Sequence, residues 1–212
     1  ISTTAKTLTL NITPKYKTVA TTDSADIQLG TNAVEIPGAS GQLTITQPVN
    51  ITVPLPSGFT AESTAYIKHV KDNGRTYYYT GTVSGEDSKT VTFVNPKGFS
   101  TFVISATNEA KASIGDVGYA TLQEAVNDVA NGQTIKLLAD GTATVSKAVT
   151  FTVVADGHNV TINAGSGYRV SESGGTYTVT YVGGSSGNVG GGSSTSTGSY
   201  AITVPTVTGG TV

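Results

Sequence analysis

Hydrophobic and polar residues alternate in short stretches along this chain, which is the pattern of β-strands with one buried face. The sharpest alternation is at Thr7–Ile12, which reads TLTLNI. Further runs of this kind lie at 26–29, 42–46, 49–53, 90–94 and 101–105. Prolines punctuate these runs, as they do at strand ends and sheet edges. Together they predict a mostly β fold whose first module, residues 1–110, is an antiparallel, immunoglobulin-like β-sandwich.

A β-hairpin is predicted at 65–80, where two alternating runs flank Asn73-Gly74. This dipeptide favours the two positive φ angles of a type I′ turn. Such a turn pairs Val70 with Tyr77 and His69 with Tyr78. The more apolar face of the hairpin is then expected to face the core, and it carries Tyr66, Val70, Tyr77, Tyr79 and Val83. The other face carries Ile67, His69, Tyr78 and Thr80.

A second, smaller β-rich module is predicted at 111–182, where a helical pattern appears. One apolar stripe predicts a short α-helix over 121–130, and it consists of Leu122, Ala125, Val126 and Val129. Thr121 and Glu124 have the spacing of a capping box, and Asn131-Gly132 is expected to end the helix as a left-handed cap. Strands are expected afterwards, at 134–138, 143–145, 149–154, 159–162, 168–170 and 176–181.

The last part of the chain is rich in glycine and serine. Fifteen of the seventeen residues in 183–199 are Gly, Ser or Thr, so this segment is predicted to be a flexible linker. Alternation resumes in 200–212, which begins YAITVP. This segment is predicted to be a β-strand, either the first of a following module or one that docks on a folded module.

Composition excludes several classes of function. Charged residues make up 12% of the chain and the formal net charge is −2, which gives no electrostatic reason to expect nucleic acid or an anionic membrane. The absence of cysteine excludes disulfides, thiolate chemistry and Cys-ligated zinc. No apolar run approaches the roughly 18 residues of a membrane span. No leader precedes Ile1, so a mature or excised fragment is expected.

Residues that could carry chemistry are scattered. The two histidines, His69 and His158, fall in different modules, and their surroundings lack known metal or catalytic spacings. Residues 183–187 match G-x-S-x-G, but they lie in the predicted linker rather than at a strand-to-helix turn. The adjacent carboxylates Glu86-Asp87 are expected in a solvated turn. We therefore expect no enzymatic activity, no cofactor and no dedicated metal site.

Two smaller possibilities remain open at this point. Loop carboxylates such as Asp23 and Asp26 could bind Ca²⁺ weakly. Lys6 and Asn108, near the two ends of the first module, could form an isopeptide bond if Glu35 lay beside them.

Three parts of the sequence resemble tandem β-rich modules of exported surface proteins from clostridia and other Gram-positive bacteria. They are Ile51–Phe59 with Gly98–Ile104, then Tyr119–Val126 with Gly132–Leu138, and the Gly/Ser segment followed by 200–205. Such proteins often carry S-layer-homology repeats that bind wall polymers. The resemblance implies an extracellular location at the cell wall, with neighbouring modules of the same chain and wall polymer or glycan as partners.

Three functions follow from these observations. The first is a non-catalytic spacer, scaffold or adhesion stalk on the cell surface. The second is a carbohydrate-binding module, with a sugar platform formed by His69, Thr76, Tyr78 and Thr80. The third is assembly or self-association by β-strand addition through 200–212.

Overall fold

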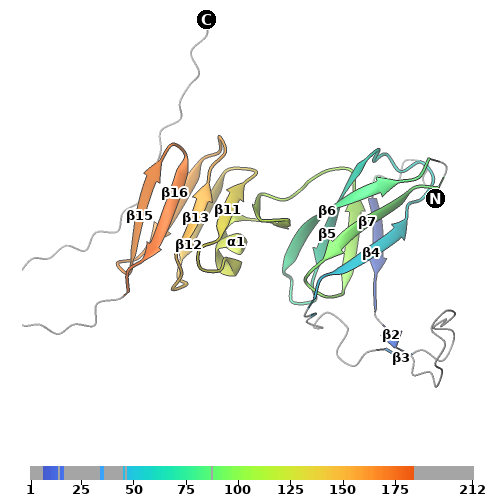
Figure 1. Cartoon of the computed structure of the whole chain (residues 1–212), viewed down its shortest axis with the longest axis horizontal. Helices are drawn as coiled ribbons and strands as arrows, with labels where there is room; N and C mark the ends of the chain where they lie inside the picture. Colours follow the sequence, from blue (N-terminus) through green and yellow to red (C-terminus); the bar gives the residue numbers. More distant parts are fainter. Residues whose placement is uncertain are drawn as a thin grey trace, which may run out of the picture. The chain divides into compact units, whose positions relative to one another are not determined.

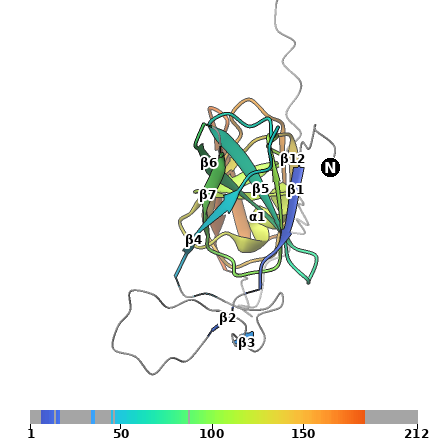
Figure 2. The same ribbon diagram turned by 90° about the vertical axis from the view of Figure 1, so that its right-hand side faces the viewer.

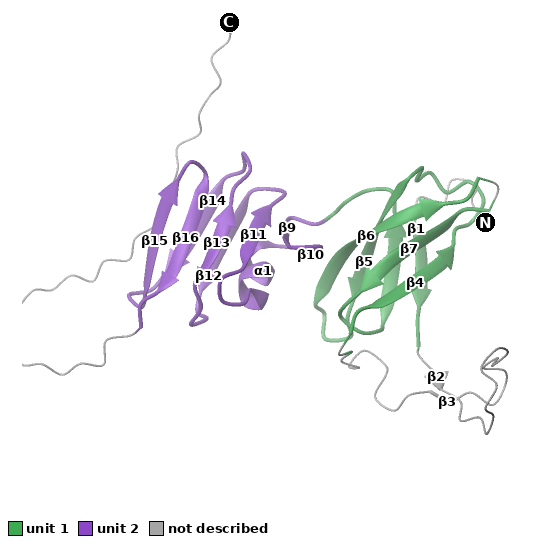
Figure 3. Cartoon of the chain, viewed as in Figure 1, with its two compact units in different colours: residues 1–109 green, residues 110–212 purple. Residues whose placement is uncertain are grey.

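The computed structural model describes residues 7–13, 15–16, 34–35, 45, 47–86 and 88–183. The chain divides into two compact units, residues 1–109 and 110–212 (Figure 3). The division falls one residue from the module boundary predicted at 110. Both units consist mainly of strands, and the described residues form one short helix, which confirms the mostly β prediction (Figure 1).

The first unit is antiparallel throughout its main sheet. The strands follow the order β1-β8-β5-β6-β7-β4. Figure 2 labels β1, β4, β5, β6 and β7 of this sheet. Their bounds are β1 (Thr7–Asn11), β4 (Val49–Pro54), β5 (Thr64–Val70), β6 (Thr76–Ser84), β7 (Thr90–Asn95) and β8 (Thr101–Ser105). Two further short strands, β2 (Lys15–Tyr16) and β3 (Val34–Glu35), pair with each other.

The long strand β6 joins two parts of this sheet. Its residues 76–82 pair with β5, and its residues 81–84 pair with β7. Gly81 belongs to both ladders, and a Cβ there would lie 2.6 Å from a methyl carbon of Val91 and 2.8 Å from one of Ile67. Glycine is therefore required at 81 because the neighbouring core side chains occupy the space of a side chain.

The hairpin between β5 and β6 has a three-residue loop, which corrects the predicted register. The amide of Gly74 donates to the carbonyl of Lys71, the amide of Lys71 donates to the carbonyl of Arg75, and both distances are 2.9 Å. Within the loop Gly74 has a φ of 82°, whereas Asn73 has no positive φ, so the turn is not type I′. Val70 therefore pairs with Thr76, and His69 pairs with Tyr77.

This shift of one residue exchanges the two faces of β5, as the two-residue period of a strand requires. Ile67 and His69 are fully buried, whereas Tyr66 and Val70 are only partly buried. The prediction was correct for β6, where Tyr77, Tyr79 and Val83 are buried, and wrong for β5. The core also contains Val91 and Phe93 of β7 with Phe102 and Ile104 of β8.

The second unit combines a mixed sheet, a two-stranded parallel sheet and the helix. The mixed sheet has the order β10-β9-β11-β13-β16-β15, in which β11 and β13 are parallel. The other sheet pairs β12 with β14 in parallel. The bounds are β9 (Ala112–Ile114), β10 (Val117–Tyr119), α1 (Leu122–Asp128), β11 (Thr134–Leu137), β12 (Gly141–Val145), β13 (Phe151–Val154), β14 (Val160–Ala164), β15 (Tyr168–Ser173) and β16 (Thr176–Tyr181).

From β11 to β15, consecutive strands alternate between the two sheets of this unit. β11 and β13 lie in one sheet and β12 and β14 in the other, so each β-β pair forms a turn of a short coil. Both sheets contribute to the core, which includes the aliphatic residues Ile135, Leu137, Val153 and Ile162 and the aromatic residue Phe151. The helix packs beside β12, where a Cβ on Gly141 would lie 2.8 Å from the Leu122 side chain.

The helix is shorter than the predicted 121–130. Thr121 caps it by accepting a hydrogen bond from the amide of Glu124 at 3.1 Å, as predicted. The Glu124 carboxylate, however, accepts from the amide of Ala120 rather than that of Thr121. The helix is capped at Val129, so the predicted left-handed cap is wrong: Gly132, with a φ of 79°, lies three residues further on.

Two turns of the second unit join strands in ways that alternation alone does not show. The β9–β10 hairpin was not predicted, because its strands of three residues are too short to show alternation. A type I′ turn occurs instead at Asp156-Gly157, with φ values of 50° and 87° and a 3.0 Å bond from the amide of His158 to the carbonyl of Ala155. This turn carries the chain from β13 to a strand of the other sheet.

A substitution at Gly74 tests the geometry of the three-residue loop. A Cβ at Gly74 meets no atom within 4 Å, so the cost of Gly74→Val comes from its positive φ alone. We expect a loss of about 1–3 kcal/mol in the free energy of unfolding of the first unit, measured by urea denaturation. The matched control is Gly165→Val, measured on the unfolding of the second unit, because the space there is also open and φ is not in the left-handed range. Equal effects of the two substitutions would contradict this loop geometry.

Candidate functional site

The structure does not bring the predicted sugar platform together. His69 is fully buried on the inner face of β5, whereas Thr76, Tyr78 and Thr80 share the opposite face of the hairpin. Tyr78 lies across from Lys68 and is itself only 7% exposed. The four residues therefore do not form one surface, because the loop is one residue longer than the turn from which their facing was predicted.

His69 is instead the centre of a buried polar and aromatic cluster. Its Nδ1 lies 2.8 Å from the Tyr79 hydroxyl, and its Nε2 lies 2.8 Å from the Ser100 hydroxyl. The imidazole stacks on Phe102, with ring centroids 4.2 Å apart and an angle of 11° between the planes. Both ring nitrogens thus have hydrogen-bond partners, which is the requirement for burying a polar side chain without a large free-energy cost.

Burial keeps the His69 ring neutral. The pKa of His69 is lowered to about 4, mainly because burial disfavours the charged imidazolium and also because the Lys71 ammonium is near. A neutral ring can donate from one nitrogen to one hydroxyl and accept at the other nitrogen from the second. This arrangement is that of a structural group in the core. Among the described residues, His69 is not part of a cluster of three His, Cys, Asp or Glu side chains that could hold a metal ion.

Basic side chains surround Tyr77 at the loop end of the hairpin. The guanidinium of Arg75 and the ammonium of Lys97 lie 5.4 Å and 5.0 Å from the centroid of the Tyr77 ring. Lys71 donates to the carbonyl of Lys97 at 2.9 Å, and burial lowers the pKa of its ammonium. These contacts use the cations in packing, through cation–π attraction and a backbone hydrogen bond.

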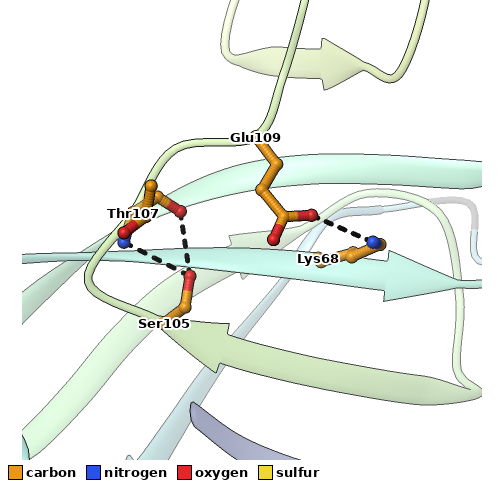
Figure 4. Close-up of polar contacts among 4 residues, drawn as sticks. All are labelled: Lys68, Ser105, Thr107 and Glu109. Carbon is orange, nitrogen blue, oxygen red and sulfur yellow. Dashed lines mark hydrogen bonds and ion pairs between the residues drawn. The ribbon is translucent and has the colours of Figure 1, made fainter. Parts of the chain in front are cut away.

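A polar cluster fastens the end of the first unit to its sheet (Figure 4). Lys68 on β5 forms an ion pair of 2.9 Å with Glu109, and the pKa of Lys68 is raised chiefly by this hydrogen bond. Ser105 at the end of β8 accepts from the amide of Thr107 and donates to its carbonyl. Figure 4 shows these side chains along the segment that leaves the unit.

A shallow groove of about 520 Å³ lies beside the end of β4 in the first unit. Its lining includes Pro56, Phe59, Glu86 and Lys89. The Lys89 ammonium donates to the carbonyl of Ala61 at 3.0 Å, and Phe59 is only 4% exposed. The groove thus offers a carboxylate and a lysine already bound to backbone, without an exposed aromatic ring among these residues.

His158 lies in the second unit, next to a carboxylate. The carboxylate of Asp140 accepts from the amide and from the side-chain nitrogen of Asn159, both at 2.9 Å, and the pKa of Asp140 is lowered mainly by these bonds. Nδ1 of His158 lies 3.7 Å from the same carboxylate. This contact links the loop before β12 to the turn before β14, so its geometry is that of a brace between successive turns of the coil.

The other sequence-based candidates lie outside the described residues. They are the calcium-binding carboxylates Asp23 and Asp26, the isopeptide lysine Lys6 with Glu35 of β3, whose side chain is not described, Asp87 of the carboxylate pair, residues 184–199 of the linker, and 200–212. Asn108, the third member of the isopeptide prediction, is exposed. No helix in the described part of the chain is long and apolar enough to cross a membrane.

Comparison with known proteins identifies no relative. No protein-family model, no curated protein and no solved structure matches this chain.

The buried imidazole gives a prediction for the dependence of stability on pH. Unfolding raises the pKa of His69 from about 4 to its ordinary value near 6.5. As the pH falls, His69 therefore takes up a proton in the unfolded chain before it does so in the folded chain. Stability of the first unit is therefore full above about pH 6.5 and falls toward pH 4, by about 3 kcal/mol in total.

Urea denaturation between pH 7.5 and pH 4 measures this loss, together with the titration of the His69 ring by NMR. Between pH 7.5 and pH 4 the first unit of the His158→Gln variant should lose as much free energy of unfolding as the unsubstituted protein. The reason is that His158 belongs to the other unit. In His69→Phe the His69 contribution should disappear. A His69 ring that becomes charged near pH 6.5 in the folded protein would contradict the prediction.

Proposed function

We propose that this chain is a non-catalytic spacer or scaffold segment of an exported cell-surface protein. The observation that carries the proposal is the presence of two compact units, each with its own buried core. Domains with separate cores can fold as separate units, and each folded unit then has compact dimensions of its own. The sequence resemblance to modules of Gram-positive surface proteins supports the extracellular location and suggests neighbouring modules and wall polymer as partners.

We further propose that the first unit is a β-sandwich. β7 and β8 are separated by β5 and β6 in the order of the sheet, yet the rings of Phe93 and Phe102 lie 5.6 Å apart. Such a contact favours a sheet that folds over onto itself, with β6 passing from one layer to the other. Fully buried Ile67 from one part and Val91 from the other support this arrangement.

The ends of the two units suit them to act in series. On the side of the first unit, Lys68 holds Glu109 against β5. In the second unit, the amide of Lys111 donates to the carbonyl of Tyr119 at 2.8 Å, and its carbonyl accepts from the amide of Leu138 at 2.9 Å. Residues on both sides of the boundary between 109 and 110 thus have partners within their own unit. The folded dimensions of the units then set the spacing along the parent protein.

Stretching a single molecule tests the proposal. We expect two separate unfolding events, because each unit has its own core. At about 3.3–3.6 Å per extended residue, unfolding of residues 7–109 and 110–183 releases about 340–370 Å and 240–270 Å of chain, before the folded lengths are subtracted.

Two core substitutions serve as matched controls. Phe102→Ala should remove or weaken only the longer event, and Phe151→Ala only the shorter one, since both rings are fully buried in different units. A single event for the whole chain, or loss of both events in either variant, would refute a pair of independent spacer units. Turnover of a substrate by the folded chain would refute the non-catalytic function.

A further inference from the structure

β15 is an edge strand in the described part of the chain. Within those residues its ladder is formed with β16, and Figure 1 draws it at the end of the second unit's sheet. An uncovered edge invites pairing with another strand, and natural proteins usually cover or interrupt it. The question is therefore which strand fits the groups that β15 presents.

The direction of the backbone groups along β15 follows from one hydrogen bond. The amide of Val182 donates to the carbonyl of Gly167 at 2.9 Å, and the next residues, Tyr168 and Tyr181, stand opposite each other. Because bonded and non-bonded pairs alternate in an antiparallel ladder, residues 169, 171 and 173 direct their backbone groups toward β16. Residues 168, 170 and 172 direct theirs toward the open side. The amide of Tyr168 donates to the carbonyl of Gly165 at 3.1 Å, in agreement with this assignment.

The same three residues share the face of the sheet that includes Val179 and Tyr177. They stand opposite Tyr181, Val179 and Tyr177, of which Val179 is fully buried and Tyr177 is 6% exposed. Tyr168 and Val170 are half-buried there, whereas Glu172 is exposed and its carboxylate accepts from the amide of Gly175. Toward the open end this apolar face becomes exposed, with Tyr181 at 40% and its ring 5.4 Å from that of Tyr168. A strand that adds here must therefore place apolar side chains on this face. In an antiparallel pair, the residues that do so are those whose N–H groups point to β15.

We propose that residues 200–205 of the same chain, which lie outside the described residues, add to β15 as an antiparallel strand. In this segment Tyr200, Ile202 and Val204 share one face, and Ala201, Thr203 and Pro205 share the other. In an antiparallel pair, residues opposite each other share a face and exchange their backbone bonds. Placing the apolar set on the face that includes Val179 thus turns the N–H groups of Ile202 and Val204 toward β15.

Pro205 selects this orientation over the parallel one. Proline has no N–H group, so it is tolerated where the backbone points away from a ladder. In the antiparallel arrangement Pro205 faces the solvent side of the new strand. In a parallel arrangement with the same apolar face inward, the N–H positions of 201, 203 and 205 would point to β15, and Pro205 would leave a gap. The positions of the apolar residues and of Pro205 are therefore both compatible with antiparallel pairing to β15.

The Gly/Ser segment has the length that this geometry requires. With Ile202 opposite Val170, Tyr200 lies beside Glu172 and Val204 beside Tyr168. The start of the strand is then about 17 Å from the end of β16, counted as four residues along β15 and two strand spacings. A free chain with the length and composition of residues 183–199 would span about 20–25 Å on average. The Gly/Ser segment therefore keeps residues 200–205 at a high effective concentration near β15 of the same chain. This favours pairing within one chain over pairing with a second copy.

This pairing goes beyond the spacer function and does not depend on it. It makes residues 183–199 a loop that returns to the second unit, and it leaves the spacing to the two folded units. It also covers the edge that would otherwise recruit other chains.

Amide hydrogen exchange of the complete chain, measured by NMR, tests the proposal. We expect the amides of Val170 and Glu172 to be protected, and the Ile202→Pro substitution to remove this protection, with exchange faster by about tenfold or more. The matched variant is Thr203→Pro, which deletes an N–H group on the solvent side and should leave the protection intact. Protected amides of Val153 and Val179 in both variants show that the second unit remains folded, since both residues are fully buried.

A cross-linking experiment gives a second readout. The chain has no cysteine, and Ser171 is exposed on the outer face of β15, opposite the position expected for Ala201. The pair Ser171→Cys and Ala201→Cys should form an intramolecular disulfide, whereas Ser171→Cys with Ile202→Cys should not, because the second pair lies on opposite faces. Unprotected amides, equal effects of the two prolines, or equal cross-linking of both cysteine pairs would overturn the proposal. Protection that appears only at high concentration, together with dimers in sizing, would overturn it in favour of exchange between copies.

Discussion

The three-residue loop Asp72–Gly74 and the set of side chains in the core of the first unit depend on one another, because both are tied to a single register of β5 and β6. This register holds Val70 opposite Thr76 and His69 opposite Tyr77, so that Ile67 and His69 turn inward. His69 then meets Phe102 of β8 and the hydroxyls of Tyr79 and Ser100. A loop shorter by one residue would bring Tyr66 and Val70 inward instead, and the imidazole would face solvent. The buried polar cluster, the packing of β8 and the pH response all follow from this register.

The second unit buries its apolar residues through a different arrangement of strands. Its strands are short, and parallel pairing of β11 with β13 and of β12 with β14 stacks successive turns of the chain. The Asp140 carboxylate braces two of these turns through Asn159, and α1 packs beside β12 where Gly141 leaves room. Stacked turns bury a continuous apolar core but leave open strands at the end of the stack, and β15 is one of these.

Several polar side chains in the described part of both units have structural partners. Lys68, Lys71, Lys89 and Asp140 have partners that hold loops or termini in place. His69 has both nitrogens bonded inside the core. Polar groups used in this way stabilise a fold, which suits the spacer function that we propose. If 200–205 also cover β15, the chain would present fewer open strand edges to its neighbours.

The sequence by itself determined the mostly β fold, the helix start at Thr121 and most strands of the second unit, because alternation, capping residues and turn residues act over a few neighbours. It did not determine the loop at Asn73-Gly74, since the same dipeptide fits a two-residue turn and the end of a three-residue loop. Only tertiary packing decides between them, through the burial of Ile67 and the hydrogen bonds of His69. The predicted sugar platform failed for this reason, because its four residues depended on that local choice. The sharing of β6 between two ladders and the parallel pairing in the second unit were likewise decided by contacts between residues far apart in the chain.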